Sequence, residues 1–336
     1  MRIAVVGAGP AGAAAGHHLA RLGHSVLLVD EHEFPRPKTC GDWITRGTLR
    51  ELEGMGLPWS QLHAEARERA EIHGSIVGAP NGGTSHVMRH RDEPSGCVPR
   101  QVFDALLVRR ALEAGCRFER ARVREPGELL GDHELVVDAR GVYAGEANTV
   151  AVRAYWTVPT ARVDAVTRST VQLFTVEHLR MGYGWIFPVD VDREHVRFNL
   201  GVGVWREEHD ARGGRIREDF ERFVEGNPVT RRLAAVALER GRTRGHHLAL
   251  ANGRTVVAGG GILRVGDAAN LTDPITGEGI ANAVLSGRLA AQAIDRARDP
   301  AHAERRWQQS YEARILPELQ AALRLRRLLQ GTRRKN

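Results

Sequence analysis

A glycine-rich turn near the start of the chain constrains the fold more than any other feature. An apolar run over residues 2–6 leads into Gly7, Gly9 and Gly12, and an alanine-rich stretch of helical character follows. A strand, a tight turn and a helix N-terminus in this order form a pyrophosphate cradle, because the glycines allow close backbone approach and the helix end offers free N–H groups. The sequence therefore predicts a Rossmann-like α/β nucleotide-binding unit at its start.

Two further segments extend this prediction to a long cofactor. A second apolar run over residues 25–29 ends in Asp30, at about the ~20-residue spacing expected of an acid that binds an adenosine ribose. Near the other end of the chain, GDAANLTDPITGEGI at 266–280 is a loop of small residues that leads into a helix. Such a loop supplies backbone donors without bulky side chains, and a helix start stabilises negative charge. Together the two segments indicate a flavoenzyme.

Length and composition narrow the class of protein. A chain of 336 residues is long enough for about two domains, and no apolar run approaches the ~20 residues of a membrane-spanning helix. Cys40, Cys97 and Cys116 are odd in number and irregular in spacing, which favours neither a disulfide framework nor a zinc site. The histidines also lack metal-ligand spacing. We expect a cytoplasmic protein without a bound metal.

The charge of the chain is a net +7, but it does not indicate a nucleic-acid partner. Lys38 and Lys335 are the only lysines, and the arginines are spread along the chain among acids. The exception is the tail, where apolar residues recur at helical spacing over 315–329 with arginines between them. We expect a terminal helix packed on the body with a solvated basic face; contact with a membrane surface is the alternative.

Hydrophobic periodicity predicts alternating helices and strands, with a β-rich middle region. Helices are expected at 44–57, 98–113, 216–224, 229–238 and 277–298, a strand pair at 72–87, and strands at 116–123, 135–138, 149–156, 167–175, 185–189, 196–202 and 262–266.

Six motifs, taken in order, resemble one known family. They are GAGPAG, KTCGDW, the helix that begins at Arg100, AVRAYW, GYGWIFP and VGDAANLTDPITGEGI. This order resembles the geranylgeranyl reductase family of FAD-dependent oxidoreductases, in the p-hydroxybenzoate hydroxylase fold group. The resemblance implies a Rossmann-like FAD-binding domain interleaved with an antiparallel β-sheet substrate domain. The expected FAD domain comprises 1–71, 98–148 and 255–299, the substrate domain 72–97 and 149–254, and a helical tail 300–336.

The resemblance also implies which residues hold FAD. Gly7, Gly9 and Gly12 are expected to contact the diphosphate, and Asp30 is expected to contact the adenosine ribose. Arg100 would reach the ribose and phosphate side, and Asp267 would bind the ribityl or diphosphate hydroxyls. Gly277 to Gly279 would lie against the isoalloxazine. The expected cofactor-binding set is completed by Pro10, Ala11, Glu31, Cys40, Gly41, Pro274, Glu278 and Ile280. The chain departs from the family where Glu31 replaces a basic residue, where Arg180 replaces a proline, and at Asp138, which we expect to be only a strand-end residue.

The candidates for the reacting site come from an aromatic strand and from a cysteine in a loop. Tyr183, Trp185 and Phe187 alternate, so a strand would point all three to one face, which the resemblance places beneath the flavin. Ordinary sheet-core aromatics are the alternative for this set. Cys40 matches a family cysteine near the flavin, where it could supply a proton or tune the pocket; the alternative is a small buried hydrophobe. The candidate catalytic set is Cys40, Tyr183 and Trp185.

The expected function is reduction of an apolar or aromatic small molecule, in secondary or isoprenoid metabolism. The resemblance implies NAD(P)H as a transient reductant, and the lack of a second dinucleotide fingerprint is compatible with that donor. Two alternatives stay open: a flavin monooxygenase that hydroxylates its substrate, and a non-catalytic flavin-binding partner protein. A halogenase is disfavoured because Lys38 lies outside the region where that chemistry places a lysine.

Overall fold

The computed structural model describes residues 1–89, 95–180 and 182–333. Its first layer is a six-stranded sheet whose central strands are parallel and apolar, as the sequence predicts. Strand β1 ends in the glycine turn, and β9 ends at Asp138, whose carboxylate is paired with Arg140 at 2.9 Å. Asp138 is therefore a strand-end residue, as expected. In order across the sheet, the strands are β16 (Ala258–Gly259), β17 (Ile262–Arg264), β9 (Leu135–Asp138), β1 (Arg2–Val6), β2 (Ser25–Asp30) and β8 (Arg117–Arg120).

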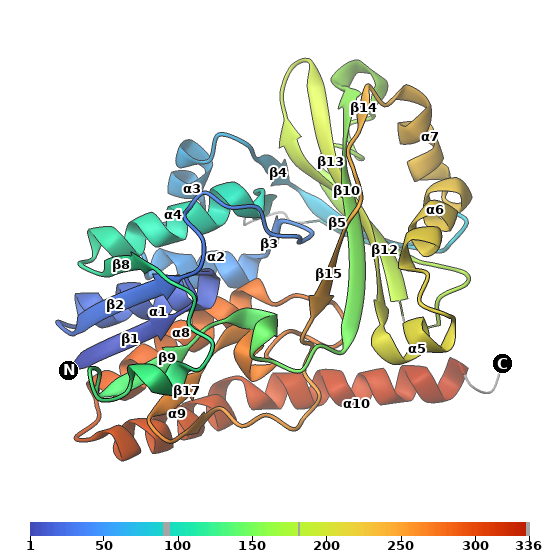
Figure 1. Ribbon diagram of the computed structural model, residues 1–336. Helices are drawn as coiled ribbons and strands as arrows, with labels where there is room; N and C mark the ends of the chain where they lie inside the picture. The colour runs from blue at the N-terminus through green and yellow to red at the C-terminus, as the bar shows by residue number, and fades with distance from the viewer. Residues whose placement is uncertain (90–94, 181, 334–336) are drawn as a thin grey trace.

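The second sheet is larger and mainly antiparallel, and the two sheets stand side by side (Figure 1). One face packs against helices α6 (Ile216–Gly226) and α7 (Pro228–Val236) through a buried cluster that includes Phe220 and Phe223. The opposite face carries Trp185 and Phe187. Its strands are β14 (Glu239–Arg240), β10 (Thr149–Pro159), β13 (His195–Trp205), β12 (Gly182–Val191), β11 (Thr170–Thr175), β5 (Gly74–Gly78) and β6 (Thr84–Arg89), with β15 (Arg244–Leu248) also paired to β10.

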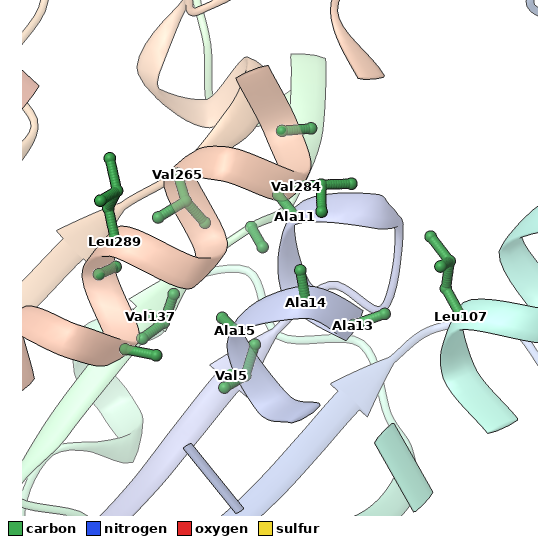
Figure 2. Close-up of a cluster of buried hydrophobic side chains, with 14 of the residues drawn as sticks. Val5, Ala11, Ala13, Ala14, Ala15, Leu107, Val137, Val265, Val284 and Leu289 are labelled. Carbon is green, nitrogen blue, oxygen red and sulfur yellow. The ribbon is translucent and has the colours of Figure 1, made fainter. Parts of the chain in front are cut away.

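Small residues let two helices of the first layer pack very closely. A Cβ added at Gly287 of α8 would lie 2.3 Å from the carbonyl oxygen of Ala11 in α1. Figure 2 shows Ala11 of α1 beside Val284 of α8, while Ala13 lies on the side of α1 toward Leu107. The contact between Ala11 and Gly287 holds the start of α1 against the middle of α8. A Cβ at Gly266 would likewise lie 2.9 Å from Ala11 Cβ, so the two segments predicted to bind the cofactor lie together. The helices are α1 (Pro10–Arg21), α2 (Arg46–Glu53), α3 (Trp59–Glu65), α4 (Arg100–Glu113), α5 (Arg206–Ala211), α6 (Ile216–Gly226), α7 (Pro228–Val236), α8 (Ile280–Asp295), α9 (Pro300–Arg314) and α10 (Leu316–Arg333).

The tail forms two helices where the sequence analysis predicted one. Helix α9 lies within the helical tail predicted over 300–336, although it was not predicted as a separate helix. It is anchored by Trp307, whose buried indole N–H donates to the carbonyls of Val257 and Arg264. Helix α10 buries Leu319 and Leu323 and runs beneath both sheets (Figure 1). Over the described residues, no helix is long and apolar enough to cross a membrane.

The smallest sheet joins the loop that follows β2 to the larger sheet. Its strands are β3 (Trp43–Ile44), β7 (Ser95–Cys97) and β4 (Ala70–Ile72).

Candidate cofactor and substrate site

The glycine turn is as tight as the sequence predicts. Gly7 has a φ of +98° and donates its N–H to Val29 O at 2.7 Å. A Cβ at Gly7 would lie 2.3 Å from Ala139 O, and one at Gly12 would lie 1.7 Å from Gly7 O. Side chains at these two positions would collide with backbone, so both glycines are required by the fold itself. Pro10 and Ala11 are buried in the first turn of α1.

Gly9 differs from the other two glycines because the space in front of it is open. Its φ is −68°, and the nearest atom to an added Cβ is Arg36 Nη2 at 3.7 Å. No side chain among the described residues caps the N-terminus of α1. Free N–H groups, an open approach and a nearby guanidinium are the features that a diphosphate requires. The turn therefore fits the diphosphate of FAD.

Asp30 holds the turn from behind. Its Oδ2 accepts the N–H of Ala8 at 2.8 Å, and its Oδ1 accepts the N–H of His32 at 2.9 Å. The next residue, Glu31, lies 3.4 Å from Arg122. A bond from Asp30 to an adenosine ribose stays a prediction, as does a cofactor contact of Glu31.

A cluster of basic side chains beside the turn was missed by the sequence analysis as a cofactor site. Arg36 and Lys38 come from the loop after β2, and Lys38 Nζ contacts His246 Nε2 on β15. Burial lowers the pKa of Lys38 to about 8 and, with Lys38 beside it, lowers the pKa of His246 to about 4. Arg36 is paired with Asp104 at 3.3 Å, whereas Lys38 has no carboxylate partner among the described residues. A largely buried cation without an ion pair is costly, so Lys38 suits a bound anion. The run PRPKTC could have indicated it, since both cations lie within six residues.

We expect Lys38→Met to weaken FAD binding roughly tenfold, the worth of about 1.4 kcal/mol. A bound diphosphate favours the protonated amine and so raises the pKa of Lys38 from about 8 toward its ordinary value of 10.5. Binding then takes up a proton between these values, and wild-type affinity should fall as pH rises through that window. Calorimetric titration with FAD should show this fall in the wild type, whereas Lys38→Arg, whose guanidinium stays protonated, should bind FAD without it. An equal fall in Lys38→Met would contradict the assignment.

Arg100 opens helix α4, but its side chain has a protein partner. Nε and Nη2 donate to the two carboxylate oxygens of Asp104 at 2.6 and 2.9 Å. Its backbone N–H donates to Asp42 Oδ1 at 3.1 Å. The guanidinium fork is thus directed at Asp104, and contact between Arg100 and the cofactor stays a prediction.

The second segment folds into a loop held by its own acids. Asp267 accepts the hydroxyl of Thr272 at 2.7 Å, and Gly277 has a φ of +70°. Glu278 accepts the N–H of Ala281 at 2.9 Å, so its carboxylate caps the start of α8. Burial raises the pKa of Glu278. Glu278 therefore occupies one of the backbone donors expected to face the cofactor at the start of α8. Pro274 and Ile280 are buried, and Gly279 lies against Thr272.

The three alternating aromatic residues do share one face of β12. Ring centroids of Tyr183 and Trp185 are 6.2 Å apart, and those of Trp185 and Phe187 are 6.4 Å apart. A Cβ at Gly41 would lie 2.9 Å from Phe187, and one at Gly277 would lie 2.7 Å from the Tyr183 hydroxyl. The aromatic face therefore touches both cofactor-domain segments, which are more than 200 residues apart.

Cys40 lies where these segments meet. Its carbonyl accepts the side-chain N–H of Asn199 at 2.6 Å, and the same amide donates to Asp42 at 2.7 Å. Burial raises the pKa of the Cys40 thiol, while the charge of Arg100 opposes that rise. Cys40 thus keeps its proton at neutral pH. Trp43 lies close by, with its ring centroid 5.9 Å from that of Phe187.

Trp185 is positioned by a glycine and an amide. Its indole N–H donates to Asn199 Oδ1 at 2.9 Å, and its ring covers Gly201 on the neighbouring strand. A Cβ at Gly201 would lie 2.1 Å from that ring, whereas one at Gly203 would meet only atoms 3.8 Å away. Gly201 therefore makes room for the indole in the aromatic face.

We expect Gly201→Ala to displace the Trp185 ring and to lower the free energy of unfolding by about 1–3 kcal/mol, the usual cost of overpacking. Denaturant unfolding and the near-ultraviolet circular dichroism of the FAD-loaded protein would measure both effects. Gly203→Ala is the matched control, because its methyl group has room. Equal behaviour of the two variants would show that Trp185 does not depend on Gly201.

The described residues hold no group of His, Cys, Asp and Glu side chains suited to a metal. The site instead consists of backbone donors, buried cations, a protonated thiol and an aromatic wall. This donor set fits FAD: the turn and the cations suit its diphosphate, and the face of β12 suits a flat ring and an apolar substrate.

Comparisons with known proteins agree with this site. A family model described as an FAD binding domain matches residues 1–186. Digeranylgeranylglycerophospholipid reductase 1 of Methanopyrus kandleri is 31% identical over 320 residues, which cover 86% of this chain and 79% of that protein. Menaquinone reductase of Mycolicibacterium smegmatis is 29% identical over 327 residues, covering 86% and 75%. A geranylgeranyl bacteriochlorophyll reductase-like structure from Thermoplasma acidophilum has a TM-score of 0.74 at 22% identity, covering 96% of this chain and 87% of that one.

Proposed function

This chain belongs to the geranylgeranyl reductase family of FAD-dependent oxidoreductases, and on that premise we propose that it reduces a carbon–carbon double bond of an apolar substrate. The observation that carries the proposal is the contact between the aromatic face of β12 and two cofactor-domain segments, Cys40–Gly41 and Thr276–Gly277. An apolar substrate on that face lies next to a protonated thiol. The relatives named as reductases of digeranylgeranylglycerophospholipid and of menaquinone support a substrate from isoprenoid or secondary metabolism.

The residues divide the work of the reaction. FAD, when bound, supplies the hydride. Gly9 and the cations Arg36 and Lys38 hold its diphosphate, and Cys40 donates the proton that completes the reduction. Tyr183 and Trp185 are fixed by hydrogen bonds to Thr276 O and Asn199, so they orient the substrate without moving. Since alkene reduction consumes one hydride and one proton, these groups account for both.

NAD(P)H is the proposed source of the hydride. A transient donor needs no dinucleotide fingerprint of its own, and the chain has only the one at Gly7. We also place the protein in the cytoplasm, a proposal supported by three free cysteines.

Product analysis with and without oxygen tests the proposal. FAD-loaded protein is incubated with NADPH or NADH and a panel of isoprenoid alkenes and aromatic compounds, and the products are identified by mass. Reduction predicts a gain of two hydrogen atoms that persists without oxygen. A product that gains an oxygen atom, and only in air, would instead establish a monooxygenase. No product under either condition would favour a non-catalytic flavin-binding protein.

A further inference from the structure

Arg153 on β10 is a buried arginine without a carboxylate partner. Arg153 is only 6% exposed, and its Nε is buried without a hydrogen-bond acceptor. Among the described residues no carboxylate oxygen lies within 4.0 Å of its nitrogens. The other buried arginine, Arg100, is 8% exposed and does have such a partner in Asp104. The charge of Arg153 does act on Asp42, but from beyond ion-pair distance. A buried charge without a directly paired opposite charge is costly, so Arg153 requires an explanation.

The contacts of Arg153 leave its hydrogen-bonding edge available. The guanidinium carbon lies 3.9 Å from the ring centroid of Tyr155, so the flat face of the group is covered. The N–H groups point outward in the plane of the guanidinium, away from the stacked ring. Asp42, the nearby buried acid, already accepts from Tyr155, Asn199 and the backbone of Arg100. Its oxygens are therefore committed elsewhere.

A second arginine stands directly opposite. Arg153 pairs with Arg244 across the antiparallel strands β10 and β15, so both side chains lie on one face of the sheet. Arg244 is exposed, and it too has no carboxylate within ion-pair distance in the described part of the chain. Like charges directly opposite one another destabilise a sheet. An anion held by both would remove that repulsion.

This face is the one that carries the aromatic residues. Arg153 pairs with Gly201, and Gly201 pairs with Trp185, so the three occupy one row across the strands. The indole covers Gly201 and so extends toward Arg153. In the next row, Gly203 leaves the sheet surface without a side chain. A cationic corner and an apolar wall are thus adjacent.

We propose that Arg153, assisted by Arg244, binds an oxyanion of the substrate, either a carboxylate or a phosphate, while the apolar part of the substrate lies on Tyr183, Trp185 and Phe187. The guanidinium fork matches either group with two parallel hydrogen bonds. This inference rests on the proposed function, which places the substrate on the aromatic face. It narrows the substrate class from an apolar molecule to an amphipathic one with an acidic head.

The test compares three ligands that share one chain and differ in the head group: octyl phosphate, octanoate and octanol. Calorimetry on the FAD-loaded wild type should give at least tenfold tighter binding of one acidic ligand than of octanol. Arg153→Met and Arg244→Met should lose that preference, and Arg153→Lys should keep part of it. Arg193→Met, on an exposed turn, is the control. Equal binding of all three ligands by the wild type, or a preference that survives both methionine substitutions, would overturn the proposal.

Two further readings separate the possible outcomes. Flavin content and circular dichroism show whether each variant is folded and loaded with FAD. If Arg153→Met does not fold or bind FAD, Arg244→Met still tests the site. The rates of flavin reduction by NADPH and NADH should keep their ratio in Arg153→Met. A changed ratio with an intact octyl preference would assign Arg153 to the reductant and overturn the substrate site. Failure of flavin reduction in the wild type would refute the proposed function, while head-group binding is measured independently of it.

Discussion

Gly9→Ala should yield a folded protein that binds FAD much more weakly. The added methyl group has room in the free chain, because its nearest neighbour is Arg36 Nη2 at 3.7 Å and the φ of −68° suits alanine. The methyl group nevertheless occupies the path by which a diphosphate approaches the turn. Relieving such an overlap costs about 1–3 kcal/mol, and so binding should weaken roughly tenfold to a hundredfold. Absorbance of bound flavin and calorimetric titration measure the loss.

Gly12→Ala provides the contrast. Its Cβ would overlap Gly7 O at 1.7 Å, so this change should lower the stability of the protein even without flavin. Denaturant unfolding of the flavin-free proteins should therefore separate the two: Gly9→Ala close to wild type, Gly12→Ala clearly less stable. If Gly9→Ala bound FAD as tightly as the wild type, the diphosphate would have to lie elsewhere.

Cys40→Ala should retain FAD but reduce its substrate slowly. General acids contribute ~10²–10⁴-fold to rate, so a fall of about a hundredfold in kcat is expected at neutral pH. Because burial raises the pKa of the thiol, the wild-type rate should stay constant through neutral pH and fall as the pH rises past that raised pKa. The alanine variant should lack this alkaline fall, since it has no thiol to lose its proton.

Cys116→Ala is the matched control for this experiment. Cys116 is buried beside Gly16 of α1, remote from the aromatic face. Its variant should keep both the rate and the alkaline fall. If Cys40→Ala kept them as well, Cys40 would be a packing residue and the proton would come from another group or from water.

The cofactor turn could be predicted because its requirements are local. The turn depends on three glycines within six residues, Gly7, Gly9 and Gly12. The side chains of Tyr183, Trp185 and Phe187 must share one face of a strand, because alternate residues of a strand point to the same side. The fold class and most helices and strands followed from similar local patterns. The division of the predicted helical tail into α9 and α10 was missed because the anchor of α9, Trp307, binds carbonyl groups on a distant segment.

The rest of the site depends on contacts between distant residues. Lys38 meets His246 across 208 positions, and Arg153 meets Arg244 only through the register of β10 and β15. Neither pair follows a spacing rule, because the sheet topology brings the strands together. The ion pair of Arg100 with Asp104 is local, because the residues are four positions apart on a helix. The same spacing also occurs on exposed helix faces, so the sequence does not show that this pair is buried.

Anaerobic oxidation of the reduced flavin tests the central claim most directly. The purified protein is loaded with FAD, reduced by one equivalent of NADPH without oxygen, and mixed with an isoprenoid alkene while the flavin absorbance is recorded. The account predicts that the oxidised absorbance returns in step with one equivalent of reduced alkene. Return of the absorbance only after oxygen is admitted, together with a hydroxylated product, would contradict it.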